Sequence, residues 1–215
     1  MRELAPLPRI QYIRDLFAPE DDYLQAIRQD LEGNEFPIQV GSEEGKLLQL
    51  LIRMNHVQSI LEIGTHGAYS TIWMARALPE DGKIITLENS PSRIERARNN
   101  IASSDVAHKI TLIEGDAVDT LNAINDTFDL IFIDADKINY ANYLDWAETH
   151  VKQGGLIIGD NTYLFENVYK DKPDNNVRPA AHRAMKEFNQ RLADSTKYCS
   201  IMLPTKEGLT IAQKL

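Results

Sequence analysis

The stretch VQSILEIGTHGAYSTIWMARAL, residues 57–78, decides the fold that this sequence predicts. It begins with a run of mostly apolar residues, passes through a turn that contains Gly64 and Gly67, and continues as a segment of helical length. A buried strand that leads through a glycine turn into a helix is the repeating unit of parallel α/β sheets. Because such sheets bind nucleotides at the carboxyl ends of their strands, we expect a ligand beyond this strand. The glycines alone equally fit a tight turn with no ligand.

Strand-like runs alternate with amphipathic helical segments through the rest of the chain. The strand candidates are VQSILEI, KIITLE, KITLIE, FDLIFID, GLIIGD, YCSIMLP and GLTIAQ. The helix candidates between them are residues 69–78, 91–103, 139–150 and 179–193. This alternation predicts an α/β fold in which a mostly parallel sheet is covered by helices on both faces. Since only residues 205–208 join the last two strands, these should pair as an antiparallel hairpin.

The N-terminal part is expected to be helical, most clearly in residues 20–31 and 43–54, and to serve as a lid or a subunit contact. We expect one domain over residues 1–215, with a helical extension over 1–54 and a core over 55–215. Ser90 before Pro91 is typical of a capped helix start. The longest expected loop, residues 162–177, follows the fifth strand.

The composition is typical of a globular protein with an acidic surface: 43% of the residues are hydrophobic and 26% are charged. The net charge of −9 repels phosphate backbones and anionic membranes, so nucleic acid is a disfavoured partner. The single cysteine, Cys199, lies in an apolar run and is expected to pack as a small hydrophobe in a reducing compartment. No signal-peptide-like or membrane-spanning stretch is found, which favours a cytoplasmic location.

Acidic residues stand at or near the ends of the first three strand candidates. Glu62, in the first, is costly to bury unless a cationic or hydrogen-bonding group meets it. Glu88 follows the glycine turn at close to the spacing of about 20 residues at which an acid binds ribose hydroxyls, although a solvated glutamate is the alternative. Asp116 follows the third strand and either faces an adenine or caps the next helix.

The glycine turn distinguishes between two cofactors that contain adenosine. A dinucleotide site prefers G-x-G-x-x-G, but here the stretch from Gly64 reads G-T-H-G-A-Y and lacks the third glycine. Glu62 would repel a pyrophosphate, whereas it would attract the ammonium or sulfonium of S-adenosylmethionine by several kcal/mol at about 4 Å before desolvation is subtracted. We therefore predict S-adenosylmethionine and regard a dehydrogenase as the weaker alternative.

Two aspartates predict a metal site at the same edge of the sheet. Asp134 and Asp160 end the fourth and fifth strand candidates, and neighbouring strands lie about 4.8 Å apart. With the amide of Asn161 they form an all-oxygen set that suits Mg²⁺, Mn²⁺ or Ca²⁺ rather than zinc. The alternative is a turn pair at 160–161 and a helix cap at Asp134. Lys137 either is solvated or accepts the proton of a hydroxyl held near the metal.

Together these motifs resemble the class I cation-dependent O-methyltransferase family, of the caffeoyl-CoA and catechol O-methyltransferase type. The matching stretches are VGSEEG, LEIGTHGAYS, TLEN, GDA, FIDADKINY, GGLIIGDN and PTKEGLTIA, from about Val40 to the C-terminus. The resemblance implies the Rossmann-like fold of S-adenosylmethionine-dependent methyltransferases, with a mostly parallel seven-stranded sheet that ends in an antiparallel hairpin. It also implies a homodimer.

The resemblance further implies roles for single residues. The residues expected at the cofactor are Val40, Glu62, Gly64, Ser70, Glu88 on the ribose, Ala117, Asp134 and Asp136. The expected metal ligands are Asp134, Asp160 and Asn161, with Lys137 as the catalytic base beside Asp134.

The chain also departs from the family pattern. Ala68 replaces the usual later glycine of the turn and Gly67 precedes it, so the cofactor is expected to lie slightly differently. The family often continues with Trp and Gly after Asp160 and Asn161, where this chain reads TYLFENVYKDKPDNN, so substrate contacts cannot be transferred.

The expected function is methyl transfer to a hydroxyl of a catechol-like or hydroxycinnamoyl small molecule. Ionising a phenol with a pKa near 10 at neutral pH costs about 4 kcal/mol, much of which a metal ion can offset. One alternative is a transfer-RNA wobble hydroxyuridine O-methyltransferase, for which Lys170, Lys172 and Arg178 would supply a local basic patch. A second alternative is a cofactor-binding protein without catalytic activity.

Overall fold

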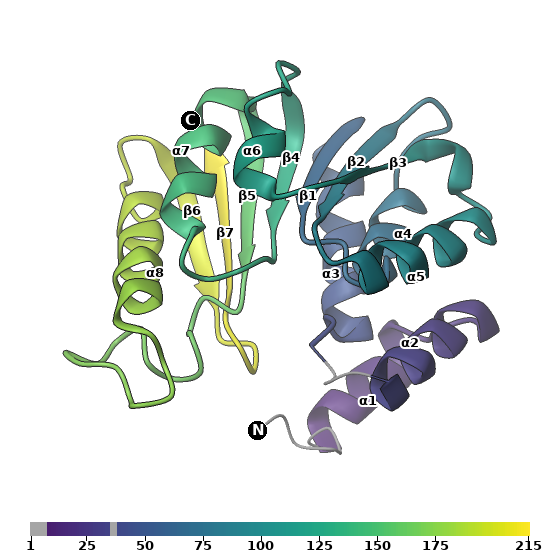
Figure 1. Ribbon diagram of the computed structural model, residues 1–215, viewed down its shortest axis with the longest axis horizontal. Helices are drawn as coiled ribbons and strands as arrows, with labels where there is room; N and C mark the ends of the chain where they lie inside the picture. The colour runs from purple at the N-terminus through teal and green to yellow at the C-terminus, as the bar shows by residue number, and fades with distance from the viewer. Residues whose placement is uncertain (1–7, 35–37) are drawn as a thin grey trace. The chain divides into compact units, whose positions relative to one another are not determined.

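The structure, a computed structural model, describes residues 8–34 and 38–215 (Figure 1). The strands are β1 Ser59–Ile63, β2 Lys83–Glu88, β3 Ile110–Glu114, β4 Phe128–Ile133, β5 Val151–Asp160, β6 Tyr198–Leu203 and β7 Leu209–Lys214. The helices are α1 Pro8–Phe17, α2 Asp22–Asn34, α3 Ser42–Met54, α4 Tyr69–Ala75, α5 Pro91–Ala102, α6 Ala117–Leu121, α7 Tyr140–His150 and α8 Pro179–Leu192, with a 3-10 turn, η1, at Ala107–Lys109. The strands form a seven-stranded sheet in the order β3-β2-β1-β4-β5-β7-β6, which confirms the predicted fold.

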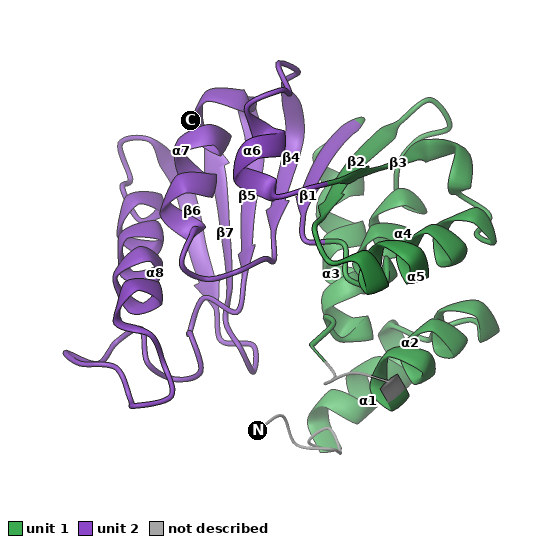
Figure 2. Ribbon diagram, viewed as in Figure 1, with its two compact units in different colours: residues 1–58, 65–114 green, residues 59–64, 115–215 purple. Residues whose placement is uncertain are grey.

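The chain divides into two compact units (Figure 2). Unit 1 comprises Met1–Gln58 and Thr65–Glu114, and unit 2 comprises Ser59–Gly64 and Gly115–Leu215. The expected single domain with a boundary after residue 54 stays a prediction, and residues 1–7 and 35–37 of its extension lie outside the described residues.

Unit 1 holds the parallel pair β2 and β3, in which Leu87 lies opposite Ile113. Helix α4 contacts β2, and α5 contacts β3. The N-terminal helices α2 and α3 both contact α4. Gly45 of α3 lets the Trp73 ring of α4 approach closely, since a Cβ at Gly45 would lie 2.7 Å from that ring. The N-terminal helices of this unit are therefore packed against the helix that follows the glycine turn.

Unit 2 holds the parallel strands β1, β4 and β5 and the antiparallel strands β7 and β6. Central residues such as Phe132 and Ile158 are 0% exposed, which accounts for the continuous apolar runs in β4 and β5. Strand β7 runs antiparallel to both β5 and β6, so the predicted C-terminal hairpin and single reversed strand are confirmed.

Several local predictions need correction. Helix α4 ends at Ala75 instead of residue 78. Ser90 does precede α5, but its side chain makes no cap hydrogen bond; its hydroxyl lies 3.3 Å from that of Ser92. The expected burial of Cys199 is wrong: the thiol is exposed, because alternation along the edge strand β6 turns its side chain to solvent. Among the described residues, no helix is long and apolar enough to cross a membrane.

Candidate functional site

The two glycines of the turn after β1 make room for protein atoms. Gly64 has a φ of +104°, and a Cβ there would lie 2.0 Å from the backbone oxygen of Asp134. The Asp134 N–H donates to the Ile63 carbonyl over 2.9 Å, so β1 and β4 continue side by side past their ends. A Cβ at Gly67 would instead meet the side chain of Leu31 at 2.5 Å. The approach of a ligand to this turn stays a prediction.

The carboxylate of Glu88, at the end of β2 in unit 1, is held by the main chain. Its Oε2 accepts a hydrogen bond of 2.8 Å from the His66 N–H, and its Oε1 accepts bonds of 3.0 Å from the N–H groups of Asn89 and Ser90. The side chain is buried. Three backbone donors thus fix this acid in one orientation, while lone pairs remain on both oxygens for a ligand.

The other residues predicted at the cofactor lie in different surroundings. In unit 1, Val40 is buried before α3, and the half-buried Ser70 lies in the first turn of α4. In unit 2, Glu62 is 0% exposed within β1, level with Phe132 of β4, and it has an interaction partner there. This acid thus lies in an apolar strand, where a buried carboxylate without a partner would be costly.

Helix α6 in unit 2 starts at Ala117, directly after Asp116. The Asp116 side chain accepts a hydrogen bond of 2.9 Å from the Val118 N–H, which is the cap role that the sequence left open.

Asp136 is exposed in the turn before α7 and is also tied to the chain. Its carboxylate accepts hydrogen bonds from the Asn139 side-chain amide at 3.0 Å and from the Tyr143 hydroxyl at 2.6 Å. Burial and this carboxylate raise the pKa of Tyr143. The contact of Asp136 with a cofactor stays a prediction.

The two aspartates predicted at the metal stand level with one another in unit 2. Ile133 pairs with Gly159 in the parallel register of β4 and β5, and each is followed by one of the aspartates, Asp134 and Asp160. Asp160 is completely buried and accepts hydrogen bonds from the backbone and side-chain N–H groups of Asn161, at 2.7 and 3.2 Å. Since that amide donates through its nitrogen, its oxygen remains available as a neutral ligand.

Lys137 lies between these strand ends. Its Nζ is 3.1 Å from Asp134 Oδ1 and 3.3 Å from the backbone oxygen of Asp160, so a cationic group already lies at this edge. Only 14% of its side chain is exposed, so it is not the solvated lysine of the alternative interpretation.

Tyr140 belongs to the FIDADKINY motif, but no role was predicted for it from the sequence. Its hydroxyl is completely buried, accepts a hydrogen bond of 2.7 Å from Lys137 Nζ, and lies 2.7 Å from the Asp160 carbonyl, to which it can donate. Burial, followed by the charges of Asp134 and Asp160, raises its pKa well above the usual value, so the phenol stays protonated. The spacing of three residues from Lys137 at a helix start was the signal that could have identified it.

The packing behind this edge explains the glycine that precedes Asp160. A Cβ at Gly159 would lie 2.7 Å from the Phe188 ring of α8, and that ring packs edge-on against Tyr140 with centroids 5.1 Å apart. The Phe188 ring therefore packs against the Tyr140 ring and so helps to fix the position of the Tyr140 hydroxyl.

The donor set fits a hard cation with few protein ligands. No cluster of three or more His, Cys, Asp or Glu side chains that could hold a metal occurs within residues 8–34 and 38–215. A cation at this edge would therefore rest on the two carboxylates and the Asn161 amide, which leaves positions for water or substrate, as Mg²⁺ commonly does.

The long segment between β5 and α8 carries the predicted basic patch and an unusual turn. Leu164, Phe165 and Glu166 all have positive φ angles, of 50°, 53° and 61°. Lys170 forms an ion pair of 2.6 Å with Asp174, so part of the positive charge expected for RNA binding is offset within the segment.

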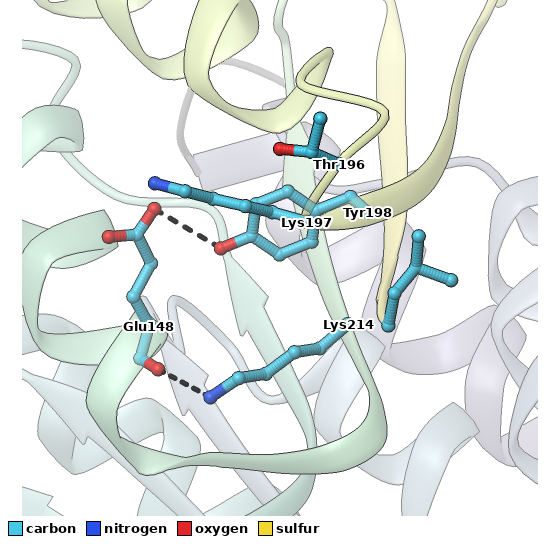
Figure 3. Close-up of a pocket in the computed structure, with 6 residues that line it drawn as sticks. Glu148, Thr196, Lys197, Tyr198 and Lys214 are labelled. Atoms are coloured by element: carbon cyan, nitrogen blue, oxygen red, sulfur yellow. Dashed lines mark hydrogen bonds between the residues drawn. The ribbon is translucent and has the colours of Figure 1, made fainter.

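A surface pocket of about 260 Å³ lies elsewhere in unit 2, at the opposite end of β7 from the residue that pairs with Asp160 (Figure 3). Within it, Tyr198 donates to the Glu148 carboxylate over 3.1 Å, and Lys214 donates to the Glu148 backbone oxygen over 2.8 Å. These contacts tie the end of α7 to the terminal strands. The pocket contains none of the predicted site residues.

Comparison with known proteins places this geometry among methyltransferases. The O-methyltransferase family model matches residues 15–215. The chain is 40% identical over 190 residues to a catechol O-methyltransferase of Niastella koreensis, which covers 86% of this chain and 84% of that protein. It is 33% identical over 217 aligned positions to a caffeoyl-CoA O-methyltransferase of Arabidopsis thaliana, which covers 95% of this chain and 83% of that protein.

A solved structure supports the same family. An O-methyltransferase of Bacillus cereus in complex with SAH superposes with a TM-score of 0.86 at 33% identity, over 95% of this chain and 96% of that one. These matches extend over the whole motif-bearing part of the sequence.

Proposed function

This chain belongs to the O-methyltransferase family, a family of S-adenosylmethionine-dependent enzymes, and we propose that it methylates a catechol-like or hydroxycinnamoyl hydroxyl with the help of a divalent metal ion. The observation that carries the proposal is the register of β4 and β5, which brings Asp134 and Asp160 level beside Lys137. The names of the relatives, catechol and caffeoyl-CoA O-methyltransferases, support the substrate class, since both names refer to compounds with neighbouring phenolic hydroxyls.

We propose S-adenosylmethionine as the methyl donor, supported by the SAH complex of the Bacillus cereus relative. Glu88 would accept hydrogen bonds from the ribose hydroxyls, because three backbone amides fix its carboxylate and leave acceptor capacity on both oxygens. The remaining proposed cofactor residues are Val40, Glu62, Gly64, Ser70, Ala117, Asp134 and Asp136.

For the metal, we propose Asp134, Asp160 and Asn161 as ligands, and Mg²⁺ as the ion that this oxygen set suits best. When bound, a divalent cation supplies a Lewis acid that lowers the pKa of an acceptor hydroxyl. The chain would keep the two aspartates level and the buried Asp160 in place, so that little reorganisation is needed when a cation binds.

Lys137 is the proposed base. Its side chain is only 14% exposed and its nitrogen lies 2.7 Å from the Tyr140 hydroxyl, so as the neutral amine it would take up the proton of the acceptor hydroxyl at this edge. The ammonium formed by this proton transfer would face the Asp134 carboxylate, and the flexible stem of lysine would let it make room for the metal ion.

The test is methyl transfer from S-adenosylmethionine to catechol and to caffeoyl-CoA by the purified protein, with EDTA and then with excess Mg²⁺. We expect O-methylated product from at least one acceptor, a fall in rate of at least about 100-fold in EDTA, and recovery on addition of Mg²⁺. A full rate in EDTA would refute the metal proposal. No product from either acceptor at any Mg²⁺ concentration would refute the substrate class.

The expected homodimer and cytoplasmic location stay proposals. Helix α1 offers a surface for a second copy, because Tyr12, Leu16 and Phe17 are 64%, 57% and 62% exposed. Light scattering coupled to size exclusion should give twice the chain mass, and Leu16→Asp combined with Phe17→Asp should shift it to the monomer. A wild-type protein that stays monomeric at high concentration would exclude the dimer.

A further inference from the structure

Helix α2 reaches the glycine turn of unit 1 directly. A Cβ at Gly67 would lie 2.5 Å from Leu31 Cδ2 and 3.0 Å from Cδ1, and the three nearest heavy atoms all belong to Leu31. Leu31 is 0% exposed, so it is enclosed by protein and cannot turn out into solvent. Since Gly67 is not among the residues with positive φ, the glycine is needed here for space and not for backbone conformation.

Polar contacts tie the same turn to the N-terminal helices on both sides of Gly67. The hydroxyl of the buried Tyr69 donates to Glu20 Oε1 over 2.7 Å, and Glu20 is held in turn by Arg28 of α2 at 2.9 Å. Burial and the Glu20 carboxylate raise the pKa of Tyr69, so the phenol remains a donor.

On the other side, the Asn100 side chain of α5 donates to the Gly67 carbonyl over 3.0 Å, and the hydroxyl of Tyr23 in α2 donates to the Asn100 backbone oxygen. Helices α2 and α4 also contact one another directly. The turn is therefore contacted by Leu31 of α2 and linked to α2 indirectly, through Glu20 on one side and Asn100 on the other.

The turn at residues 65–68 also orients the Glu88 carboxylate. His66, the residue before Gly67, has a φ of 51° and gives its N–H to Glu88 Oε2 at 2.8 Å. Ala68, the residue after Gly67, has a φ of 64°, an uncommon conformation for alanine that persists only where surrounding contacts impose it. A displacement of residues 65–68 would thus move one of the three donors that orient the Glu88 carboxylate.

We propose that α2 is a positioning element for the cofactor, acting through the Leu31–Gly67 contact and the Tyr69–Glu20 hydrogen bond to set the turn at residues 65–68 and the Glu88 carboxylate. This inference rests on the proposed function, because it takes Glu88 as a cofactor ligand. It assigns to α2 of the N-terminal extension a role in cofactor affinity, beside the subunit contact proposed for α1.

The test is a double-mutant cycle on the full chain with S-adenosylmethionine affinity measured by calorimetry. Gly67→Ala should weaken binding roughly tenfold, because overpacking a filled contact displaces the turn. Gly67→Ala combined with Leu31→Ala should recover binding to within about threefold of wild type, since the second change removes the three atoms that the new methyl meets. Tyr69→Phe, which keeps the ring, should weaken binding about threefold.

The matched control is Gly33→Ala in the same helix, where a Cβ would meet nothing within 4 Å. It should leave the affinity unchanged. Melting temperature and kcat at saturating cofactor are measured in parallel, and a positioning role predicts a higher KM for S-adenosylmethionine with kcat within about twofold.

The outcomes separate the two hypotheses. If wild type binds S-adenosylmethionine but Gly67→Ala changes only the melting temperature, or the double variant binds no better than Gly67→Ala alone, the positioning role is refuted and the proposed function stands. If Gly67→Ala does not fold, unchanged affinity in Tyr69→Phe refutes the role. If wild type itself does not bind, both proposals fail.

Discussion

Glu88 and Asp134 are both acids at the carboxyl ends of parallel strands, but the chain holds them by different means. Glu88 accepts hydrogen bonds from three backbone N–H groups, whereas Asp134 faces the ammonium of Lys137 at 3.1 Å. Backbone donors cannot leave without distortion of the turn, but a lysine side chain can move aside. Under the proposed function, Glu88 would bind neutral hydroxyls in a fixed geometry, and Asp134 would exchange the Lys137 ammonium for a metal ion.

The largest effect is expected for Asp160. Replacement by Ala, or by Asn to keep the shape, removes one of two carboxylates from the proposed metal set and should lower metal-dependent turnover at least about 100-fold. Affinity for S-adenosylmethionine should stay within about threefold of wild type. Initial rates against Mg²⁺ concentration and calorimetry with the cofactor measure the two quantities.

The control for this variant is Asp126→Ala, an exposed acid in the same unit. Wild-type turnover in both Asp160 variants would mean that Asp134 and Asp160 do not share a cation, and the contrast with Glu88 would disappear.

The second-largest effect is expected for replacement of Lys137. Lys137→Met keeps the apolar stem and should lower kcat about 100-fold, the lower end of the range for a general base. Lys172→Met, at an exposed lysine in the same unit, should leave kcat unchanged. An unaltered kcat for Lys137→Met at saturating substrates would remove Lys137 from the chemistry and leave it as a structural ion pair.

Glu88→Gln should weaken the binding of the cofactor and leave the dependence on the metal ion unchanged. The neutral amide loses the charge that strengthens hydrogen bonds from ribose, so we expect roughly tenfold weaker binding of S-adenosylmethionine. Turnover at saturating cofactor and the Mg²⁺ dependence should be nearly unchanged. Glu114→Gln is the matched control, because Glu114 lies level with Glu88 on β3 and is 53% exposed. Equal effects of the two changes would argue against a ribose contact.

The smallest effect is expected for Tyr140→Phe. The change keeps the ring against Phe188 but removes the hydroxyl that accepts from Lys137, so kcat should fall about tenfold or less. Loss of a buried hydrogen bond of about 1 kcal/mol should lower the melting temperature by about 2–4 °C. Tyr169→Phe, at an exposed tyrosine, serves as the control. A changed melting temperature with an unchanged kcat would reduce Tyr140 to a structural role.

Much of the fold could be predicted from the sequence, because its signals are local. Every predicted strand is present, and strand β2 has the predicted bounds, since apolar runs of strand length mark the interior of a parallel sheet. Short elements without a strong apolar period were given no bounds: α1, within the part expected to be helical, has no buried residues, and α6, the helix that Asp116 was one candidate to cap, spans only Ala117–Leu121.

The features of the candidate site likewise fall into those that the sequence predicts and those that only the structure shows. The sequence by itself determined which acids end which strands, since Asp134 and Asp160 follow apolar runs whose period and neighbours fix their edge of the sheet. Only the tertiary structure decided that Tyr140 meets Lys137 and the Asp160 carbonyl, that Asp116 caps a helix, and that Leu31 fills the space at Gly67. The physical reason is the separation of the interacting residues along the chain. The periodicity of a strand is visible in adjacent residues, whereas the contact of Leu31 with Gly67 depends on how elements far apart in the sequence pack together, which no local pattern encodes.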